Sequence, residues 1–402
     1  MPAETDTPRL LTFSTLYPHA AAPNHGVFVE NRLRHLTASG AARSIVLAPV
    51  PYFPSGAAMF GSWAVAARAP HEEMRHGMRV LHPRFPVIPR FGMWCAPWLL
   101  YRVSLRAMRR LLAAGERFDV IDAHYLYPDG VAATWLGHAV GLPVVITARG
   151  SDVTQIPLFR WPRFLIQRAI EAADALITVS AALREELLRL GAPADKVTVL
   201  RNGVDTELFR SPDRAAARSA LQLDGPTLLS VGHLIPRKGH NRIIQAMVDL
   251  PGQLLIAGEG PDWGKLEDQI TRLGLSGRVR LLGSVPHAEL PRLYGAADAL
   301  VLASSREGWA NVLLEAMACG TPVLASNIPG NPEVVREPAA GRIMTENTPA
   351  GIVAGIKALL ANPPERAATR AYAERFDWSA TTAGQLALFR TVIAKRATSP
   401  VR

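Results

Sequence analysis

The stretch from residue 299 to residue 325 constrains the fold more than any other part of the chain. Residues 299–303 form an apolar run, which is typical of a strand buried in a parallel sheet. A polar loop carrying Glu307 follows, and residues 311–319 are rich in helix formers and end at a Gly-Thr-Pro stop. Residues 322–325 are a second short apolar run. The order strand, loop, helix and strand predicts a unit of a parallel α/β sheet.

This unit carries groups that suit a phosphorylated sugar. Backbone N–H groups at the start of the expected helix, at Asn311 and Val312, favour a phosphate. Glu315 lies further along the helix, where a carboxylate can accept hydrogen bonds from sugar hydroxyls, as the acid does in dinucleotide-binding folds. Glu307 precedes the helix and can reach a second set of hydroxyls. The pattern therefore favours a nucleotide sugar over a bare phosphate.

The residues around the two glutamates resemble a known signature. Seven residues separate Glu307 from Glu315 in the sequence E-G-W-A-N-V-L-L-E-A-M-A-C-G-T-P-V. This sequence resembles the motif of retaining GT-B glycosyltransferases of the type called family 4 or group 1. Two glutamates at this spacing also occur in ordinary α/β units, but here the flanking Asn-Val, Ala-Met-Ala and Gly-Thr-Pro-Val match as well. The resemblance implies an α/β protein with two Rossmann-like lobes, whose parallel sheets face each other across an interdomain cleft.

The α/β pattern occurs twice along the chain, which fits two such lobes. Apolar runs alternate with helical segments up to an Asn-Gly-Val-Asp turn at residues 202–205, and the pattern restarts at residue 227. With the resemblance, this predicts an N-terminal acceptor-binding domain at residues 1–210 and a C-terminal nucleotide-sugar-binding domain at residues 211–375. The resemblance further implies that residues 376–402 form a helix that crosses back to the N-terminal domain.

The chain has an excess of basic residues. Its 44 Lys and Arg outnumber its 34 Asp and Glu, which gives a formal net charge of +10. Such an excess suggests an anionic partner, either a membrane surface or a phosphorylated substrate, and a diffuse arginine-rich surface is the alternative. No nucleic-acid-binding motif accompanies the charge, so we expect no nucleic-acid partner.

Cysteine content and hydropathy point to a cytoplasmic protein. Cys95 and Cys319 are too few for a disulfide framework or a zinc site. Residues 1–8 lack the pattern of a signal peptide, and no run of about 18 apolar residues occurs. We therefore expect a cytoplasmic location without a membrane span, with peripheral association at the inner face of the cell membrane as a further possibility.

Two segments of the N-terminal half combine aromatic with basic residues. Residues 90–102 hold two tryptophans between arginines, and residues 159–168 form a basic amphipathic segment with Trp161 and Phe164. Both segments suit an interfacial contact with anionic lipid, and the first could also cradle an acceptor. Ordinary helix packing with a solvated basic face is the alternative for both.

Four residues of the N-terminal half are candidate ligands of the sugar or the acceptor. Gly26 lies between the first strand and its helix, where the resemblance implies a contact with the donor diphosphate, and a plain turn glycine is the alternative. His124 ends a predicted strand, where open α/β sheets bind ligands, and the resemblance implies a contact with the sugar. Arg149 and Asp152 belong to an Arg-Gly-Ser-Asp turn that the resemblance places near the acceptor, and a capping role is the alternative for Asp152.

The loop after residue 231 resembles the family's Gly-Arg-Leu and Lys-Gly elements, which neutralise the donor diphosphate. Lys238 stands at the lysine position, whereas His233 stands at the position of the arginine. A neutral imidazole is a weaker counter-charge than a guanidinium, so Arg237 is a candidate for the missing charge. The resemblance adds two weaker candidates: Glu259, within a Gly-Glu-Gly turn, and Val285, in a loop that frames the nucleotide base.

The resemblance implies a hexosyltransferase-type enzyme that moves a sugar, with retention, from a nucleotide-diphosphate sugar to a hydroxyl. The acceptor would be a glycan or a lipid-linked saccharide of cell-surface polysaccharide synthesis. No Asp-x-Asp motif is available to hold a metal, so we expect basic residues to stabilise the leaving diphosphate and expect no metal or other cofactor. His124, Lys238 and Glu307 would be the catalytic residues.

Three other functions remain open. A nucleotide-sugar epimerase or a phosphorylase can share the two-lobe fold, but their own catalytic motifs are absent. A non-catalytic nucleotide-sugar-binding protein is conceivable because of His233, although Glu307, Glu315 and Lys238 are intact. A Rossmann dehydrogenase is disfavoured, since no Gly-x-Gly-x-x-Gly follows the first strand.

Overall fold

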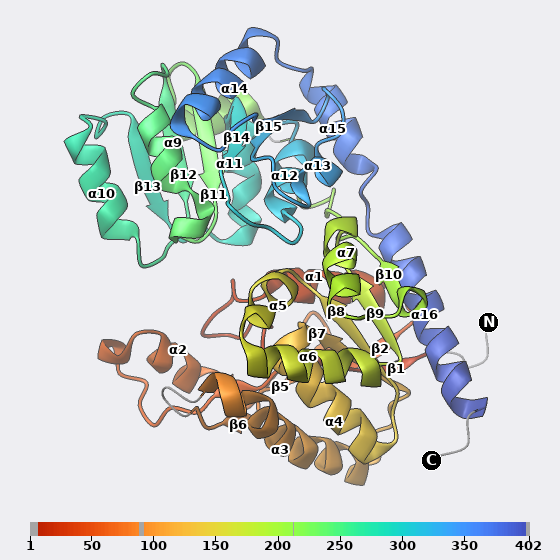
Figure 1. The fold of residues 1–402 in the computed structure, drawn as a ribbon. Helices are drawn as coiled ribbons and strands as arrows, with labels where there is room; N and C mark the ends of the chain where they lie inside the picture. Colours follow the sequence, from red (N-terminus) through yellow and green to blue (C-terminus); the bar gives the residue numbers. More distant parts are fainter. Residues whose placement is uncertain (1–6, 88–91, 212, 399–402) are drawn as a thin grey trace. The chain divides into compact units, whose positions relative to one another are not determined.

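A computed structural model describes residues 7–87, 92–211 and 213–398 of the chain. The chain divides into two compact units, Met1–Arg201 with Ser379–Arg402, and Asn202–Trp378 (Figure 1). These units meet after Arg201 and after Trp378, whereas the sequence leads us to expect boundaries after residues 210 and 375. The C-terminal helix belongs to the first unit.

The first unit is built on an eight-stranded sheet in the order β10-β9-β8-β7-β1-β2-β5-β4. Its strands are β1 (Arg9–Phe13), β2 (Arg43–Leu47), β4 (Glu72–Arg75), β5 (Met78–Leu81), β7 (Val120–His124), β8 (Val144–Ala148), β9 (Ala175–Thr178) and β10 (Val197–Val199). Strands β1, β7, β8 and β9 are almost entirely buried and, apart from Asp122 and His124 of β7, mainly apolar, as expected of a parallel sheet covered on both faces. The strand order changes direction between β1 and β7.

Helices cover both faces of this sheet (Figure 1). On one face, α1 (Val27–Ala38) and α16 (Ser379–Thr398) share a hydrophobic cluster with the strands, in which Leu33 and Phe389 are fully buried. On the other face lie α3 (Gly92–Ala113), α4 (Val131–Val140) and α6 (Arg160–Ala172). Helix α4 approaches the sheet so closely that a Cβ at Gly137 would lie 2.3 Å from Cγ2 of Val144.

The edge of the first sheet departs from the purely parallel arrangement that the sequence predicts. Strand β4 pairs antiparallel with β5. The two strands are joined by His76 and Gly77, which both have positive φ angles, 48° and 77°. Such a two-residue turn matches the twist of a hairpin, and glycine adopts it without steric cost. The β4 sequence Glu-Glu-Met-Arg contains no apolar run that would predict a strand.

The second unit contains a six-stranded, fully parallel sheet in the order β13-β12-β11-β14-β15-β16. Its strands are β11 (Thr227–Val231), β12 (Gln253–Ala257), β13 (Val279–Gly283), β14 (Ala299–Leu302), β15 (Val323–Ala325) and β16 (Gly341–Ile343). One face packs in a hydrophobic cluster with α9 (His240–Ala246), α10 (Trp263–Arg272) and α14 (Pro349–Ala361). Helices α8 (Arg214–Ala220), α11 (Leu290–Ala296), α12 (Asn311–Ala318) and α15 (Arg366–Glu374) pack against one another as a second group.

Short elements complete the two units. They are β3 (Val50–Pro51), β6 (Arg84–Phe85), α2 (Ser62–Arg68), α5 (Ser151–Thr154), α7 (Ala181–Arg189), α13 (Asn331–Val334), and the helical turns η2 (Ala58–Phe60), η3 (Leu126–Gly130), η4 (Ile156–Leu158), η5 (Ala194–Lys196), η6 (Pro236–Lys238) and η7 (His287–Glu289). No helix among the described residues is long and apolar enough to span a bilayer. Both cysteines are free.

The aromatic segment expected at residues 90–102 is the first part of α3, a helix of 22 residues that continues past Pro97. Residues 90 and 91 lie outside the described residues. The missing N–H of Pro97 leaves the Met93 carbonyl without its partner in the helix, and the Tyr127 hydroxyl donates to that carbonyl instead.

Candidate active site

In the second sheet the strand order reverses between β11 and β14, which are hydrogen-bonded parallel neighbours. In open α/β sheets, ligands bind outside the carboxyl ends of the strands at such a switch point. Lys238 lies in the loop that follows β11, and Glu307 lies in the loop that follows β14. The fold therefore brings together two candidate residues that are far apart in the sequence.

Lys238 and Glu307 form a sheltered ion pair. The Lys238 Nζ donates to Glu307 Oε1 at 2.6 Å, and the two side chains are 15% and 9% exposed. Burial alone would raise the pKa of Glu307, but the charge and hydrogen bond of Lys238, with Arg237, outweigh it and hold the pKa below its ordinary value. Glu307 is therefore an ionised acceptor of hydrogen bonds near neutral pH.

Gly239 allows the two loops to meet. Its φ is 71°, and a Cβ there would lie 2.3 Å from the carbonyl oxygen of Ala303 at the end of β14. The backbone of Ser305 also donates to the carbonyl of Arg237 at 2.8 Å. Because only glycine fits this conformation and this approach, Gly239 fixes the place of its neighbour Lys238.

Arg237, rather than His233, adds a second positive charge beside Glu307. The Arg237 Nη1 donates to the Arg306 carbonyl at 2.8 Å and lies 3.5 Å from Glu307 Oε2. His233 is exposed at the start of the same loop. Burial, followed by the charge of Lys238, lowers the pKa of the neighbouring His240 to about 4, so His240 is neutral at pH 7. Arg237, Lys238 and Glu307 together leave one excess positive charge, which suits an anion.

Helix α12 begins beside this cluster. Its N-cap residue is Ala310, whose side chain cannot cap, so the helix itself leaves the N–H groups of Asn311 and Val312 unpaired. The Asn311 Oδ1 accepts a hydrogen bond from Asn202 at 3.2 Å. The start of α12 thus offers backbone donors and a partial positive charge.

Glu315 is held by two residues that the sequence analysis misses. The Tyr294 hydroxyl donates to Glu315 Oε2 at 2.8 Å, and His287 Nε2 lies 3.3 Å from Oε1. Burial, with the nearby charge of Glu315, raises the pKa of Tyr294 well above its ordinary value, so Tyr294 stays a donor. No motif signals either residue, because both contact Glu315 from separate elements, α11 and η7.

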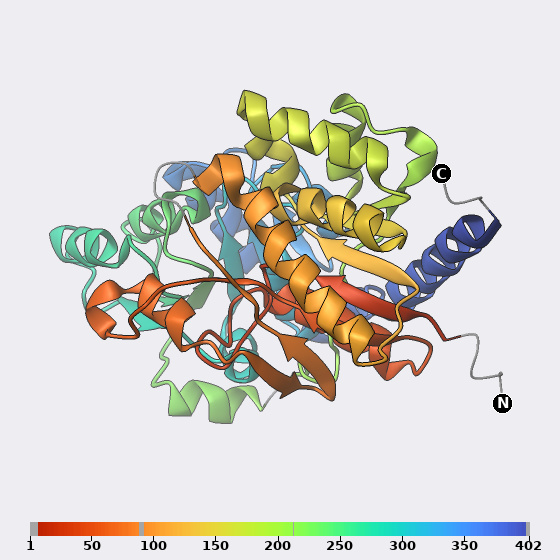
Figure 2. The ribbon, with the colours of Figure 1, turned by 90° about the horizontal axis from the view of Figure 1, so that it is seen from below.

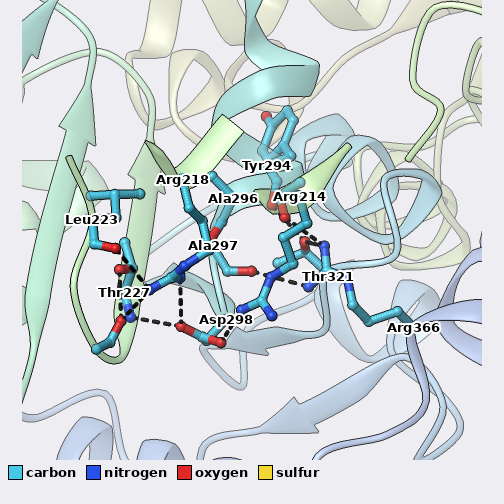
Figure 3. A network of polar contacts seen from close by, with 12 residues as sticks. Arg214, Arg218, Leu223, Thr227, Tyr294, Ala296, Ala297, Asp298, Thr321 and Arg366 are labelled. Carbon is cyan, nitrogen blue, oxygen red and sulfur yellow. Dashed lines mark hydrogen bonds and ion pairs between the residues drawn. The ribbon is translucent and has the colours of Figure 1, made fainter. Parts of the chain in front are cut away.

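A polar network fixes the position of Tyr294 (Figure 3). Its carbonyl accepts a hydrogen bond from Thr321 Oγ1 at 2.6 Å, and Thr321 Oγ1 accepts one from Arg366 at 2.7 Å. Asp298, just before β14, accepts from the backbone of Thr227 at 2.8 Å and pairs with Arg214 and Arg218 of α8. This network anchors α11 and thereby orients the hydroxyl that contacts Glu315.

Glu259 and Val285 lie near the ends of β12 and β13. Glu259 is exposed and Val285 is half-buried. The flanking glycines have a packing role, because a Cβ at Gly258 would lie 1.9 Å from the Gly232 carbonyl oxygen and one at Gly260 would lie 2.5 Å from that of Leu234. The Gly-Glu-Gly turn therefore fits closely against the loop that leads to Lys238.

Gly26 and His124 flank the switch point of the first sheet. Gly26 precedes α1 in the connection after β1, and His124 is the last residue of β7, the neighbour of β1. The φ of Gly26 is 69°, and a Cβ there would lie 2.3 Å from the Leu16 carbonyl oxygen. This close contact requires glycine at position 26 even without a ligand, as expected of a plain turn glycine.

His124 is buried and neutral. Its side chain is 1% exposed, and burial, with the charge of Arg149, lowers its pKa although Asp122 opposes the shift. The Arg149 Nη2 lies 2.7 Å from His124 Nδ1. Since arginine can only donate, Nδ1 is the acceptor and Nε2, 3.3 Å from Asp122 Oδ2, carries the proton. Direct contact between this ring and a substrate would require one of these two neighbours to move.

A buried chain of polar groups connects His124 to the C-terminal helix. Arg32 donates to Gln385 Oε1 at 3.0 Å, and Gln385 Nε2 donates to Asp122 Oδ2 at 3.4 Å. Burial lowers the pKa of Arg149 to about 9 and that of Arg32 to about 10. The sequence analysis misses Arg32, Asp122 and Gln385, because their proximity depends on the return of α16 to the first unit.

Asp152 has the contacts of a capping residue. It is fully buried, and its carboxylate accepts backbone hydrogen bonds from Leu126 at 2.8 Å, Arg149 at 3.1 Å and Gly150 at 2.6 Å. These contacts fit the capping role that the sequence analysis gives as the alternative. They hold the Arg149 turn against the loop that follows His124.

Two family models match the two units. The model described as "Glycosyltransferase Family 4" matches residues 57–208, and that described as "Glycosyl transferases group 1" matches residues 213–376. Among solved structures, sucrose-phosphate synthase from Thermosynechococcus elongatus has a TM-score of 0.78 at 21% identity, over 97% of this chain and 100% of that one. The Anabaena protein HepE in complex with UDP-glucose has a TM-score of 0.70 at 20% identity, over 95% and 99%. These likenesses show the GT-B fold.

Curated relatives match at higher identity. The D-inositol 3-phosphate glycosyltransferase 1 of Catenulispora acidiphila is 32% identical over 70% of this chain and 74% of its own length. The D-inositol 3-phosphate glycosyltransferase of Thermobispora bispora is 33% identical over 66% and 69%. With two parallel-sheet domains of the GT-B fold and a signature that runs from Lys238 to Glu315, the chain belongs to the group 1 (family 4) glycosyltransferases and is an enzyme.

Proposed function

We propose that the protein transfers a sugar, with retention and without a metal, from a nucleotide-diphosphate sugar to a hydroxyl acceptor. The observation that supports this most is the Lys238–Glu307 pair at the switch point of the second sheet. A cation for the diphosphate and an ionised acceptor for sugar hydroxyls stand side by side there. Solved structures of the same fold hold UDP-glucose or UDP, which supports this class of donor.

The proposed chemistry is stabilisation of the leaving group. Breaking the bond between sugar and diphosphate builds negative charge on the diphosphate, and Lys238, Arg237 and the N–H groups of Asn311 and Val312 would receive it. Removing one such donor costs about 2.7–4 kcal/mol in other enzymes. When the diphosphate takes over Lys238, the carboxylate of Glu307 becomes free to accept hydrogen bonds from the sugar.

Glu315 is proposed to hold the ribose of the donor. Its carboxylate accepts one hydrogen bond from Tyr294 and faces His287, so its orientation is fixed before a ligand binds. A carboxylate accepts up to about four hydrogen bonds, which leaves capacity for two ribose hydroxyls. Val285 and Glu259, at neighbouring strand ends, are proposed to line the base side of the donor, and exposed His233 to add a weak contact to the phosphates.

The first unit is proposed to bind the acceptor. His124 and Arg149 would contact hydroxyls after their mutual hydrogen bond opens, while Gly26 would let the backbone approach the donor. The carboxylate of Asp152 would position Arg149 through its hydrogen bonds to the backbone of that turn. A glycan or lipid-linked saccharide is the first choice of acceptor, and polysaccharide synthesis at the cytoplasmic side of the membrane is the proposed setting. Exposed aromatic side chains on α3 and α6 of this unit support the membrane setting.

A phosphorylated polyol is the second candidate acceptor. The curated relatives with the matches above are both named D-inositol 3-phosphate glycosyltransferases. The unit that would bind it holds two buried arginines, Arg32 and Arg149. A radiolabelled-sugar transfer assay with lipid-linked saccharides and inositol phosphates as parallel acceptors distinguishes the two.

Turnover of purified protein with a panel of nucleotide-diphosphate sugars tests the reaction class. Transfer should persist in EDTA, and the anomeric configuration of the product, read by proton NMR, should equal that of the donor. Inversion at the anomeric carbon would contradict the retaining mechanism, and activity that EDTA abolishes would contradict the metal-free one.

A further inference from the structure

An unusual exposed surface lies on the first unit. It consists of Met93, Trp94 and Trp98 of α3 with Phe159, Trp161 and Phe164 at the start of α6, and we call it the aromatic face. Trp94 is 58% exposed, and Trp98 and Phe164 are each 50% exposed. Side chains of this size are normally buried, and a contiguous exposed group marks an interaction site.

The aromatic face is one surface although its two segments are far apart in the sequence. The rings of Trp94 and Trp161 stack with their centroids 6.4 Å apart, and Trp161 and Phe164 stack at 5.7 Å. The Trp161 Nε1 also donates to the Trp94 carbonyl at 3.3 Å. The start of α3 therefore lies against the start of α6, as Figure 2 shows for the orange and yellow-green helices.

Arginines continue this surface. Trp94, Trp98, Arg102 and Arg106 are spaced four residues apart, so they share one side of α3, and the Arg102 guanidinium lies 5.1 Å from the centre of the Trp98 ring. Arg160 and Arg163 are exposed at the start of α6. Helix α3 contains no acidic residue, and the one acid of α6, Glu171, pairs with Arg168.

We propose that the aromatic face and its flanking arginines bind an anionic phospholipid bilayer. Tryptophan and phenylalanine rings favour the boundary between headgroups and acyl chains, and arginines favour the lipid phosphates. The single sign of charge around the face matches a uniformly anionic surface. This inference concerns where the enzyme docks, so it stands independently of the donor-site assignment.

Vesicle flotation tests this proposal with the full-length protein. The wild type should float with vesicles of 70% phosphatidylcholine and 30% phosphatidylglycerol, should stay unbound with pure phosphatidylcholine, and should be released by salt. The pair Arg102→Gln and Arg163→Gln should weaken partitioning roughly 30-fold, since each arginine near an anionic surface contributes about 1 kcal/mol. Trp98→Ser with Phe164→Ser should weaken it at least tenfold.

Matched controls use exposed residues that belong to neither α3 nor α6. Arg272→Gln with Arg342→Gln removes the same charge at exposed positions of the second unit. Met74→Ser with Val248→Ser removes exposed apolar side chains elsewhere. Both control pairs should bind vesicles within twofold of the wild type. Equal weakening in the control pairs would overturn the assignment to this surface.

A second measurement needs no variant. Lipids brominated near the headgroup end of their acyl chains should quench the tryptophan fluorescence of the wild type, because Trp94, Trp98 and Trp161 would lie at that depth. Absence of both flotation and quenching would overturn the proposal. A concentration-dependent dimer that is lost in Trp98→Ser with Phe164→Ser, without vesicle binding, would assign the face to a second copy instead.

Discussion

At the scale of single residues, the site depends on charges whose partners are already in place. Lys238 neutralises Glu307, and Arg149 donates to His124 Nδ1, so neither the carboxylate nor the imidazole is left unpaired in a poorly solvated place. Removing one partner of a buried charged pair leaves an unpaired buried charge, and this destabilises the fold by more than the intact pair stabilises it. Each of these side chains therefore positions its partner as well as itself.

His124 gives a prediction at this scale. Replacement by leucine removes the acceptor of the buried Arg149 guanidinium and should lower the free energy of unfolding by about 3 kcal/mol. His124→Asn places an oxygen near the position of Nδ1 and should recover a large part of that loss. Urea denaturation of both variants checks this, and equal stability of the two would show that the Arg149 contact does not hold the fold.

The sequence can name candidate site residues where a motif or the end of a predicted strand marks them. Glu307, Glu315 and Lys238 are candidates because the motif keeps fixed spacings along the chain. Tyr294, His287, Arg32 and Gln385 were missed because their contacts join separate elements. Sequence also could not show that His124 is enclosed, since the packing of α16 and Arg149 around it is a tertiary property.

At the scale of elements, the loops after β11 and β14 create the candidate donor site. Strand order puts them side by side, and Gly239 lets their backbones touch. The two strands on either side of α12, β14 and β15, were predicted to within a residue at each end from their continuous apolar runs, whereas β16 was not predicted. The edge strand β4 was missed, since its sequence Glu-Glu-Met-Arg carries no such run.

Gly239→Ala tests the loop contact. The alanine must adopt a φ near 71°, and its Cβ would also collide with the Ala303 carbonyl. Gly274→Ala is a matched control, because Gly274 has a similar φ of 67° with nothing near its missing Cβ. The control should cost about 1 kcal/mol of stability from backbone conformation alone. Gly239→Ala should cost more and should also weaken donor binding in calorimetry, whereas equal costs would refute the close approach.

At the scale of the whole molecule, the sheets of both units have a switch in strand order, the place where open α/β sheets bind ligands. Both switch points carry the residues that the sequence analysis singles out, Gly26 and His124 in one unit, Lys238 and Glu307 in the other. The C-terminal helix belongs to the first unit although it follows the second in the chain. The sequence predicts this fold because apolar runs alternate with helical segments twice along the chain and the signature around Glu307 resembles that of a GT-B family.

The stability of the protein should depend on pH through Asp129. Burial raises the pKa of Asp129 to about 7, although hydrogen bonds from Thr15 oppose the shift. Between about pH 4 and pH 7 the folded protein keeps a proton that the unfolded chain has released, so stability falls as the pH rises through this window. Asp129→Asn keeps an acceptor for Thr15 and removes the titration.

Thermal unfolding at pH 5 and at pH 8 checks this prediction. The melting temperature of the wild type should fall more between the two pH values than that of Asp129→Asn. Because each unit of pKa shift corresponds to about 1.4 kcal/mol, the difference should be easily measured. An identical pH dependence in the two proteins would show that Asp129 does not cause the fall in stability.

The central claim is that Lys238, held by Glu307 at the switch point of the second sheet, binds the donor diphosphate. Calorimetric titration of a nucleoside diphosphate into Lys238→Met tests this, with Lys265→Met as the control because Lys265 is 80% exposed and pairs with Asp262 at 3.2 Å. We expect Lys238→Met to bind at least tenfold more weakly, in keeping with a loss of about 1.5–3 kcal/mol for a charged hydrogen bond, and Lys265→Met to bind like the wild type. Unchanged affinity in a folded Lys238→Met protein would contradict it.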